Sequence, residues 1–124
     1  MIRDSRGRLL LVRRGRPPGE GLWSLPGGRV EAGEGDLAAV VREVAEETGL
    51  AIAPGALLGA VERPAPGGAI FEIRDYEATV TGGDLIAGDD AADVRWAGAA
   101  AFAALPLTPG LAEVLASWHV VPAG

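Results

Sequence analysis

The sequence contains no cysteine and no lysine, and it has only one histidine, one tyrosine and one methionine. The absence of cysteine excludes disulfide bonds, thiolate metal sites and a thiol nucleophile. Because His119 is the single histidine, neither a histidine-rich metal site nor a histidine-based catalytic triad is expected. No apolar run approaches the ~20 residues of a membrane span, and no signal-peptide pattern opens the chain. We therefore expect a cytoplasmic protein that does not associate with membranes.

The charged residues are unevenly distributed along the 124-residue chain, whose formal net charge is −6. Its length suits one domain over residues 1–124. Residues 1–16 hold six arginines against one acid, Asp4, so the remainder is strongly acidic. Such a surface repels duplex nucleic acid, and a phosphate-bearing ligand would need a divalent cation between it and the carboxylates. The arginine-rich segment is interpreted either as a solvated flank of a strand or as a ligand-steering surface.

The strongest predicted element is a helix over residues 37–48. Leu37, Val40, Val41 and Val44 recur at i, i+3, i+4 and i+7, which is the pattern of an amphipathic helix. Asp36 is the expected N-cap, and Gly49 suits the left-handed position that follows a helix.

The remaining pattern alternates strands with short helices. A change of apolar face near Arg74-Asp75 predicts a β-bulge, and Thr108-Pro109 is expected to cap the last helix. Strands interleaved with two or three helices favour an α/β sandwich around a mixed β-sheet. Extended segments are expected at 8–14, 22–25, 57–63, 69–81 and 94–96, and further helices at 99–104 and 111–118.

Three glutamates gather on one side of the 37–48 helix. On an ideal helix Glu43, Glu46 and Glu47 fall within an arc of about 100°. Glu47 borders the buried face, Glu43 comes next, and Glu46 is the most exposed. Two further acids, Glu31 and Glu34, stand in the preceding glycine-rich segment. This crowding indicates either a site for a hard cation such as Mg²⁺, which takes oxygen ligands, or an ordinary solvated acidic helix face.

The spacing of these residues resembles the Nudix box, the signature of the Nudix hydrolase family. The preceding Trp23-Ser24-Leu25-Pro26-Gly27-Gly28 is also similar to that family. The matching positions, which span Gly28–Leu50, are Gly28, Glu34, Arg42, Glu43, apolar Val44, Glu46, Glu47, Gly49 and apolar Leu50.

The resemblance implies an α/β/α sandwich that binds Mg²⁺ or Mn²⁺ and hydrolyses a nucleoside diphosphate linked to another group. Carried over, Glu46 and Glu47 would be metal ligands, and Glu43 a further ligand or the base that activates water. Arg42 would hold Glu43 by a charge-assisted hydrogen bond. The carbonyl of Gly27 would be an additional ligand, and Gly28, Glu31 and Glu34 would support the loop or an extra metal ion.

Residues outside the box are assigned on weaker signals. Asp90, with Asp89 and Asp93 beside it, is a candidate base or metal ligand in a later loop, against the alternative of a solvated turn. Trp23 would either stack on a nucleotide base or pack in the core, and Tyr76 has the same two interpretations. Arg14 is a further candidate for substrate binding.

The first strand of the predicted sheet is shortened. Only Met1-Ile2-Arg3 stands where family members usually have a full apolar strand. Either the start is truncated, or a partner strand completes the sheet. An unpaired edge beside residues 9–12 would favour aggregation, so a homodimer that covers this edge is one hypothesis.

The resemblance leaves three functional hypotheses. The first is a pyrophosphohydrolase of ADP-ribose or a related nucleotide sugar, for which Pro64 and Pro66 resemble a feature of the ADP-ribose branch. The second is a house-cleaning hydrolase of oxidised or non-standard nucleoside triphosphates. The third, a non-catalytic nucleotide-sensing module, predicts loss of box carboxylates, and none is lost.

Overall fold

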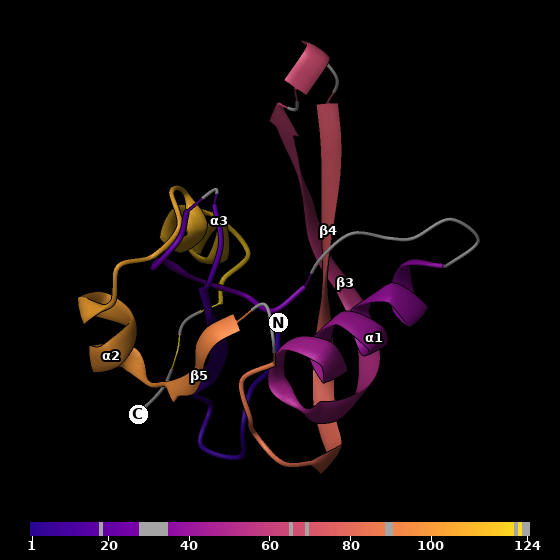
Figure 1. Ribbon diagram of the computed structural model, residues 1–124, viewed down its shortest axis with the longest axis vertical. Helices are drawn as coiled ribbons and strands as arrows, with labels where there is room; N and C mark the ends of the chain where they lie inside the picture. The colour runs from indigo at the N-terminus through magenta and orange to yellow at the C-terminus, as the bar shows by residue number, and fades with distance from the viewer. Residues whose placement is uncertain are drawn as a thin grey trace.

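The computed structural model describes residues 1–17, 19–27, 35–64, 66–68, 70–88, 91–120 and 122. These residues form two antiparallel sheets and three α-helices (Figure 1). The first sheet has the order β2-β1-β5, and the second is the hairpin β3-β4. The strands are β1 (Leu9–Arg14), β2 (Trp23–Ser24), β3 (Leu50–Pro64), β4 (Ile70–Gly83) and β5 (Ala91–Ala97). The helices are α1 (Asp36–Thr48), α2 (Ala99–Ala104) and α3 (Leu111–Ser117). A short 3-10 turn, η1 (Pro66–Gly68), lies between β3 and β4.

Strand β1 lies at the centre of the molecule. Alternate side chains of a strand point to opposite faces, and here both faces are covered. Leu10 packs with Val44 of α1, whereas Leu9 packs with Leu115 of α3 and Leu11 lies in a cluster that Phe102 of α2 contacts. All three leucines are fully buried. The α/β/α layering expected from the sequence is therefore confirmed, with α1 on one side and α2 and α3 on the other.

The prediction of an open edge beside residues 9–12 is wrong. Strand β1 pairs with β2 on one side and with β5 on the other, both antiparallel. The segment before β1 makes single bridges, Ile2 to Ala78 in parallel and Arg3 to Leu9 in antiparallel fashion, and these connect the two sheets. The argument that a second copy must cover β1 therefore no longer holds, and a homodimer stays an untested prediction.

The hairpin β3-β4 is longer than the pattern predicted, and it extends beyond the other elements in Figure 1. β3 begins at Leu50 rather than at Leu57, because Pro54 and Gly55 interrupt the pattern without ending the ladder. The register shifts between Pro54 and Leu57 and again between Leu57 and Gly59. The irregularity expected at Arg74-Asp75 is present, but the extra residue lies in β3, opposite Asp75 and Tyr76.

Two predicted helix caps are wrong. Gly35 occupies the N-cap of α1, so Asp36 is the first helical residue, and Gly110 rather than Thr108 precedes α3. Leu37, in the first turn of α1, is 47% exposed, while Ala39 and Val44 are buried. Gly49 adopts the expected left-handed conformation with φ of 76°. No helix in the described ranges has both the length and the apolar character needed to span a membrane.

Candidate functional site

The carboxylates of α1 are organised by Arg42. Its Nη1 lies 2.9 Å from Oε1 of Glu43 and 3.1 Å from Oε2 of Glu46. The side chain of Glu43 is 18% exposed and that of Glu46 is 59% exposed, which is the order of exposure expected from the helix geometry. The contact anticipated between Arg42 and Glu43 is therefore present. One guanidinium holds two carboxylates that would otherwise repel each other.

Glu47 is held from outside the helix. Its Oε1 accepts a hydrogen bond of 3.0 Å from the backbone N–H of Gly27, twenty residues earlier. Gly27 is the third residue after β2, following Leu25 and Pro26, so this bond brings the end of the β2 segment to the C-terminal half of α1. Gly27 and Glu47, both expected at the metal site, thus lie together.

The segment 84–88, which joins β4 to β5, contacts the C-terminal turn of α1. The N–H of Ile86 donates to the carbonyl of Thr48 and the N–H of Gly88 donates to that of Glu47, both at 2.9 Å. Sequence reasoning missed Gly88, whose only signal is a glycine between an apolar residue and two acids. The backbone of Gly88 lies against the backbone of Glu46 and Glu47.

Arg14, at the end of β1, lies at the border of this region. In the antiparallel ladder it pairs with Ala91 at the start of β5, and the N–H of Ala91 donates to the carbonyl of Gly88 at 3.2 Å. Arg14 is thus paired with a residue that is hydrogen-bonded to Gly88, in the segment that contacts α1. Its side chain is half-buried, and the aliphatic part lies beside Gly19.

Tyr76 is engaged at the opposite end of α1. Its hydroxyl donates to Oδ2 of Asp36 at 3.1 Å, and Nη1 of Arg74 donates to the same oxygen at 2.8 Å. These two hydrogen bonds lower the pKa of Asp36, whereas burial and then the bond to Asp36 raise the pKa of Tyr76. Tyr76 therefore fastens β4 to the first turn of α1. Asp36 is used as a tertiary contact instead of a helix cap.

Trp23 is a core residue. The residue is 5% exposed and packs with Leu11 and Ala97. The guanidinium carbon of Arg13 lies 6.0 Å from the ring centroid, at the outer range of a cation–π contact. The packing interpretation of Trp23 therefore fits the structure, and the ring has little surface left on which a base could stack.

Several predicted site residues lie outside the described residues. Asp93, which is described, uses its Oδ1 to accept a hydrogen bond from the N–H of Val94 at 2.8 Å, a local contact at the start of β5. The residues outside the described ranges, whose roles stay predictions from the sequence, are Gly28, Glu31, Glu34, Asp89 and Asp90.

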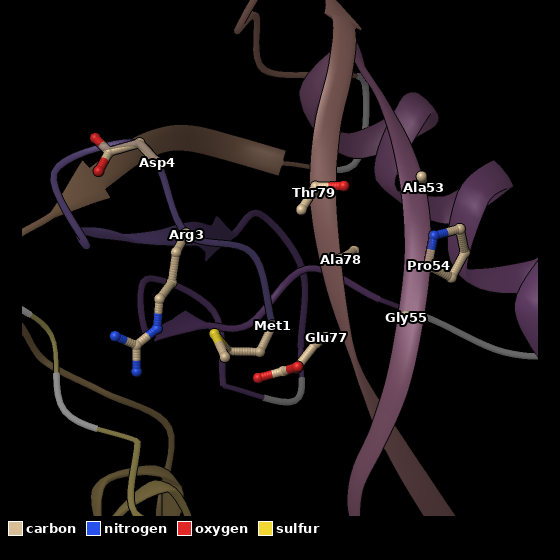
Figure 2. Close-up of a pocket in the computed structure, with 9 residues that line it drawn as sticks. All are labelled: Met1, Arg3, Asp4, Ala53, Pro54, Gly55, Glu77, Ala78 and Thr79. Atoms are coloured by element: carbon tan, nitrogen blue, oxygen red, sulfur yellow. The ribbon is translucent and has the colours of Figure 1, made fainter.

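A pocket at the N-terminal segment lies away from the glutamates of α1. Figure 2 shows it between the N-terminal segment, with Met1, Arg3 and Asp4, and residues of β3 and β4. The carboxylate of Asp4 is bonded to the guanidinium of Arg8 at 2.7 Å. No residue of α1 lines this pocket, so it is separate from the acidic site.

The donor set on α1 fits a hard divalent cation in chemical type. Carboxylate oxygens are the ligands that Mg²⁺ and Mn²⁺ prefer, and Glu43, Glu46 and Glu47 supply them from adjacent turns of one helix. As the side chains stand, with Arg42 and Gly27 as their partners, no three acidic or histidine side chains among the described residues converge on one point. For all three carboxylates to bind one cation, their side chains would have to reorient.

The chain is similar to two proteins named as a pyrophosphatase and a phosphatase of nucleotides. The chain is 41% identical over 97 residues to an ADP-ribose pyrophosphatase of Methanocaldococcus jannaschii, covering 77% of this chain and 57% of that protein. It is 38% identical over 74 residues to an 8-oxo-(d)GTP phosphatase of Mycolicibacterium smegmatis, covering 60% of this chain and 23% of that one. This chain thus spans just over half of the archaeal relative and under a quarter of the mycobacterial one.

The fold agrees with the sequence matches. A MutT NUDIX hydrolase from Burkholderia pseudomallei superposes with a TM-score of 0.74 at 32% identity, covering 92% of this chain and 90% of that structure. The family model of the NUDIX domain matches residues 1–118, which include α1 and the segments that contact it. The chain belongs to the Nudix hydrolase family.

Proposed function

We propose that the protein is a metal-dependent pyrophosphohydrolase acting on ADP-ribose or a related nucleotide sugar. The observation that carries the proposal is the organisation of Glu43 and Glu46 around Arg42, with Glu47 one turn away and tied to Gly27. Folding alone does not favour three carboxylates in this arrangement, since like charges at i, i+4 repel. A divalent cation removes that repulsion and provides the link to an anionic substrate.

In the proposed reaction a water oxygen attacks one phosphorus of the substrate and the P–O–P anhydride breaks. The products are a nucleoside monophosphate and a sugar phosphate. When bound, Mg²⁺ or Mn²⁺ lowers the pKa of a coordinated water and neutralises charge on the diphosphate. Glu46 and Glu47 would hold the cation, joined by the carbonyl of Gly27.

Glu43 would accept the proton of the attacking water. Arg42 keeps its carboxylate in a fixed position at 2.9 Å, and charge-assisted pairs of this kind are geometrically stable. Asp90 is the alternative base or an additional ligand. Chain connectivity supports that alternative, because Asp90 follows by two residues the glycine that contacts α1. Glu31, Glu34 and Gly28 are proposed to support the loop before α1.

The substrate class is supported by the archaeal relative, which is named an ADP-ribose pyrophosphatase. The mycobacterial relative, named an 8-oxo-(d)GTP phosphatase, favours a second candidate, the hydrolysis of oxidised nucleoside triphosphates. A non-catalytic sensing role is disfavoured, because every carboxylate of the box is present. A cytoplasmic location and a single domain over residues 1–124 remain predictions from the sequence.

A screen of purified protein tests the proposal. ADP-ribose, other nucleotide sugars, dinucleoside polyphosphates, 8-oxo-dGTP and ordinary nucleoside triphosphates are each incubated with Mg²⁺ or with Mn²⁺, and the products are separated. The proposal predicts that ADP-ribose or a related nucleotide sugar is converted with the highest kcat/KM. A preference for 8-oxo-dGTP selects the second candidate, and no hydrolysis of any substrate contradicts both.

A further inference from the structure

The C-terminal turn of α1 is completed by another part of the chain. The last four carbonyls of a helix have no partner within the helix. In this protein the N–H groups of Ile86 and Gly88 supply partners for Thr48 and Glu47. Ile86 is 66% exposed, and its contact with α1 is a backbone hydrogen bond. We call residues 84–88 the clamp segment.

Gly88 is the position where the clamp segment comes closest to α1. A Cβ atom on Gly88 would overlap the carbonyl oxygen of Glu46 and lie 2.9 Å from its carbonyl carbon. Both are backbone atoms, so no side chain can rotate away to make room. Gly88 does not have a left-handed φ, so its requirement for glycine is one of space and not of backbone conformation.

The residues under the clamp are the two proposed cation ligands. The N–H of Gly88 donates to the carbonyl of Glu47, and its Cα faces the carbonyl of Glu46. To accept a methyl group here, the helix and the segment must separate by about 1 Å, because folded interiors are close-packed. Ligand positions must be held within about 0.5 Å to work, so the separation exceeds what the site tolerates.

The clamp also connects α1 to the central strand. The carbonyl of Gly88 accepts from the N–H of Ala91, and Ala91 pairs with Arg14 of β1. A displacement at Gly88 therefore changes how α1 lies relative to the sheet that carries Arg14. Backbone hydrogen bonds and one strand pairing thus connect α1 to β1 through Gly88.

We propose that Gly88 is a positioning residue for the hydrolytic site. The absence of a side chain lets the clamp segment rest on the last turn of α1, and this contact fixes the backbone from which the side chains of Glu46 and Glu47 turn to bind a divalent cation. The inference rests on the proposed function in one respect, the use of these carboxylates as cation ligands.

The variant Gly88→Ala tests the proposal, with Gly82→Ala as its matched control. A Cβ on Gly82 would meet nothing within 4 Å, and Gly82 does not have a left-handed φ. Both proteins are checked for native circular dichroism, and Mn²⁺ binding is then measured by calorimetry without nucleotide. We expect Gly88→Ala to bind Mn²⁺ about tenfold more weakly and to lose about 10²-fold in kcat with little change in KM, since 1 Å misplacements have costs of this size. Gly82→Ala should match the unmodified protein.

Mn²⁺ affinity separates a positioning role from a merely structural one. If Gly88 served stability alone, the variant would melt at a lower temperature but bind Mn²⁺ normally while folded. Normal Mn²⁺ affinity and kcat in folded Gly88→Ala would overturn the inference and leave the proposed function intact. Failure of the unmodified protein to bind Mn²⁺, both without nucleotide and with it, would instead contradict the proposed function itself.

A measurement on the unmodified protein covers the case in which Gly88→Ala does not fold. Coupling between two events is reciprocal, so if the clamp favours cation binding, the cation must favour the clamp. We expect Mg²⁺ to slow hydrogen exchange at the amides of Ile86 and Gly88, with no change at Gly7, whose amide donates to Asp4 in a remote turn. Exchange at Ile86 and Gly88 that is unaffected by saturating Mg²⁺ would contradict the proposal.

Discussion

The backbone amide of Gly27 and the carboxylate of Glu47 are joined by a hydrogen bond of 3.0 Å across twenty residues of sequence. This bond connects the end of the β2 segment to the last full turn of α1. It also orients one carboxylate oxygen of Glu47 toward Gly27. In the proposed function the carboxylate of Glu47 would also bind the cation, so the bond to Gly27 would set the position of a metal ligand.

Glu47→Gln tests the ligand role. The glutamine side chain has the same shape and its amide oxygen can still accept from Gly27, so we expect native folding and a melting temperature close to that of the unmodified protein. Hydrolysis should be abolished, because a neutral amide is a far weaker ligand for Mg²⁺ than a carboxylate. Steady-state kinetics with Mg²⁺ checks this. Turnover near that of the unmodified protein would show that Glu47 is not a ligand.

Glu43→Gln and Asp90→Asn together identify the general base. Glu43 is the less exposed partner of Arg42, and we expect its replacement to lower kcat by about 10²–10⁴-fold, the range for loss of a general base. Asp90→Asn should have a smaller effect. The two variants are compared at saturating substrate and metal ion. The reverse order of effects would assign the base to Asp90.

Gly59 and Trp118 make another close approach, at which an added Cβ would force the indole to move. A Cβ on Gly59 would overlap the indole Nε1 of Trp118 and lie 2.9 Å from Cζ2. Gly59→Ala should displace the indole from the hairpin, change its fluorescence and destabilise the fold by about 1–3 kcal/mol, as overpacking does. Gly55→Ala, in the same strand, makes only an ordinary 3.5 Å contact and is the control. Identical emission spectra and urea midpoints for the two variants would contradict this packing.

The lowered pKa of Asp36 predicts how the stability of the fold depends on pH. Its hydrogen bonds to Arg74 and Tyr76 lower its pKa in the folded state, so the ionised form stabilises the protein above the unfolded value of about 3.9. That contribution is lost as the pH falls through the lower, folded pKa. Asp36→Asn should therefore have a lower urea midpoint than the unmodified protein at pH 7, with the difference shrinking toward pH 3. An equal difference at both pH values would show that the charge of Asp36 is not involved.

The elements that depend on local pattern were predictable from the sequence. Helix α2 has the bounds 99–104 that were expected, and α1 differs by one residue at its start. The relative exposure of Glu43 and Glu46 followed from helix geometry alone. In each case the information lies within a few turns of the chain, where periodicity is a direct consequence of the backbone.

The features that depend on distant partners were not predictable. Asp36 looked like a helix cap, and only the position of β4 shows that Arg74 and Tyr76 bind it. β1 looked exposed on the edge next to residues 1–3, and only the structure shows that the bridge from Arg3, the hydrogen bond from Leu10 to Ile2 and the pairing with β2 cover it. Gly88 gave no signal beyond being a glycine before two acids, since its role depends on the close approach of a helix from another part of the chain. Non-local contacts of this kind have no periodic trace in the sequence.

Calorimetric titration of the purified protein with Mg²⁺ and with Mn²⁺, in the presence and absence of ADP-ribose, tests the central claim most directly. The account predicts saturable binding that is lost in Glu47→Gln and strengthened by nucleotide, because the cation links the carboxylates of α1 to the diphosphate. An absence of saturable binding by either ion, even with nucleotide present, would contradict the claim that the glutamates of α1 form a metal site.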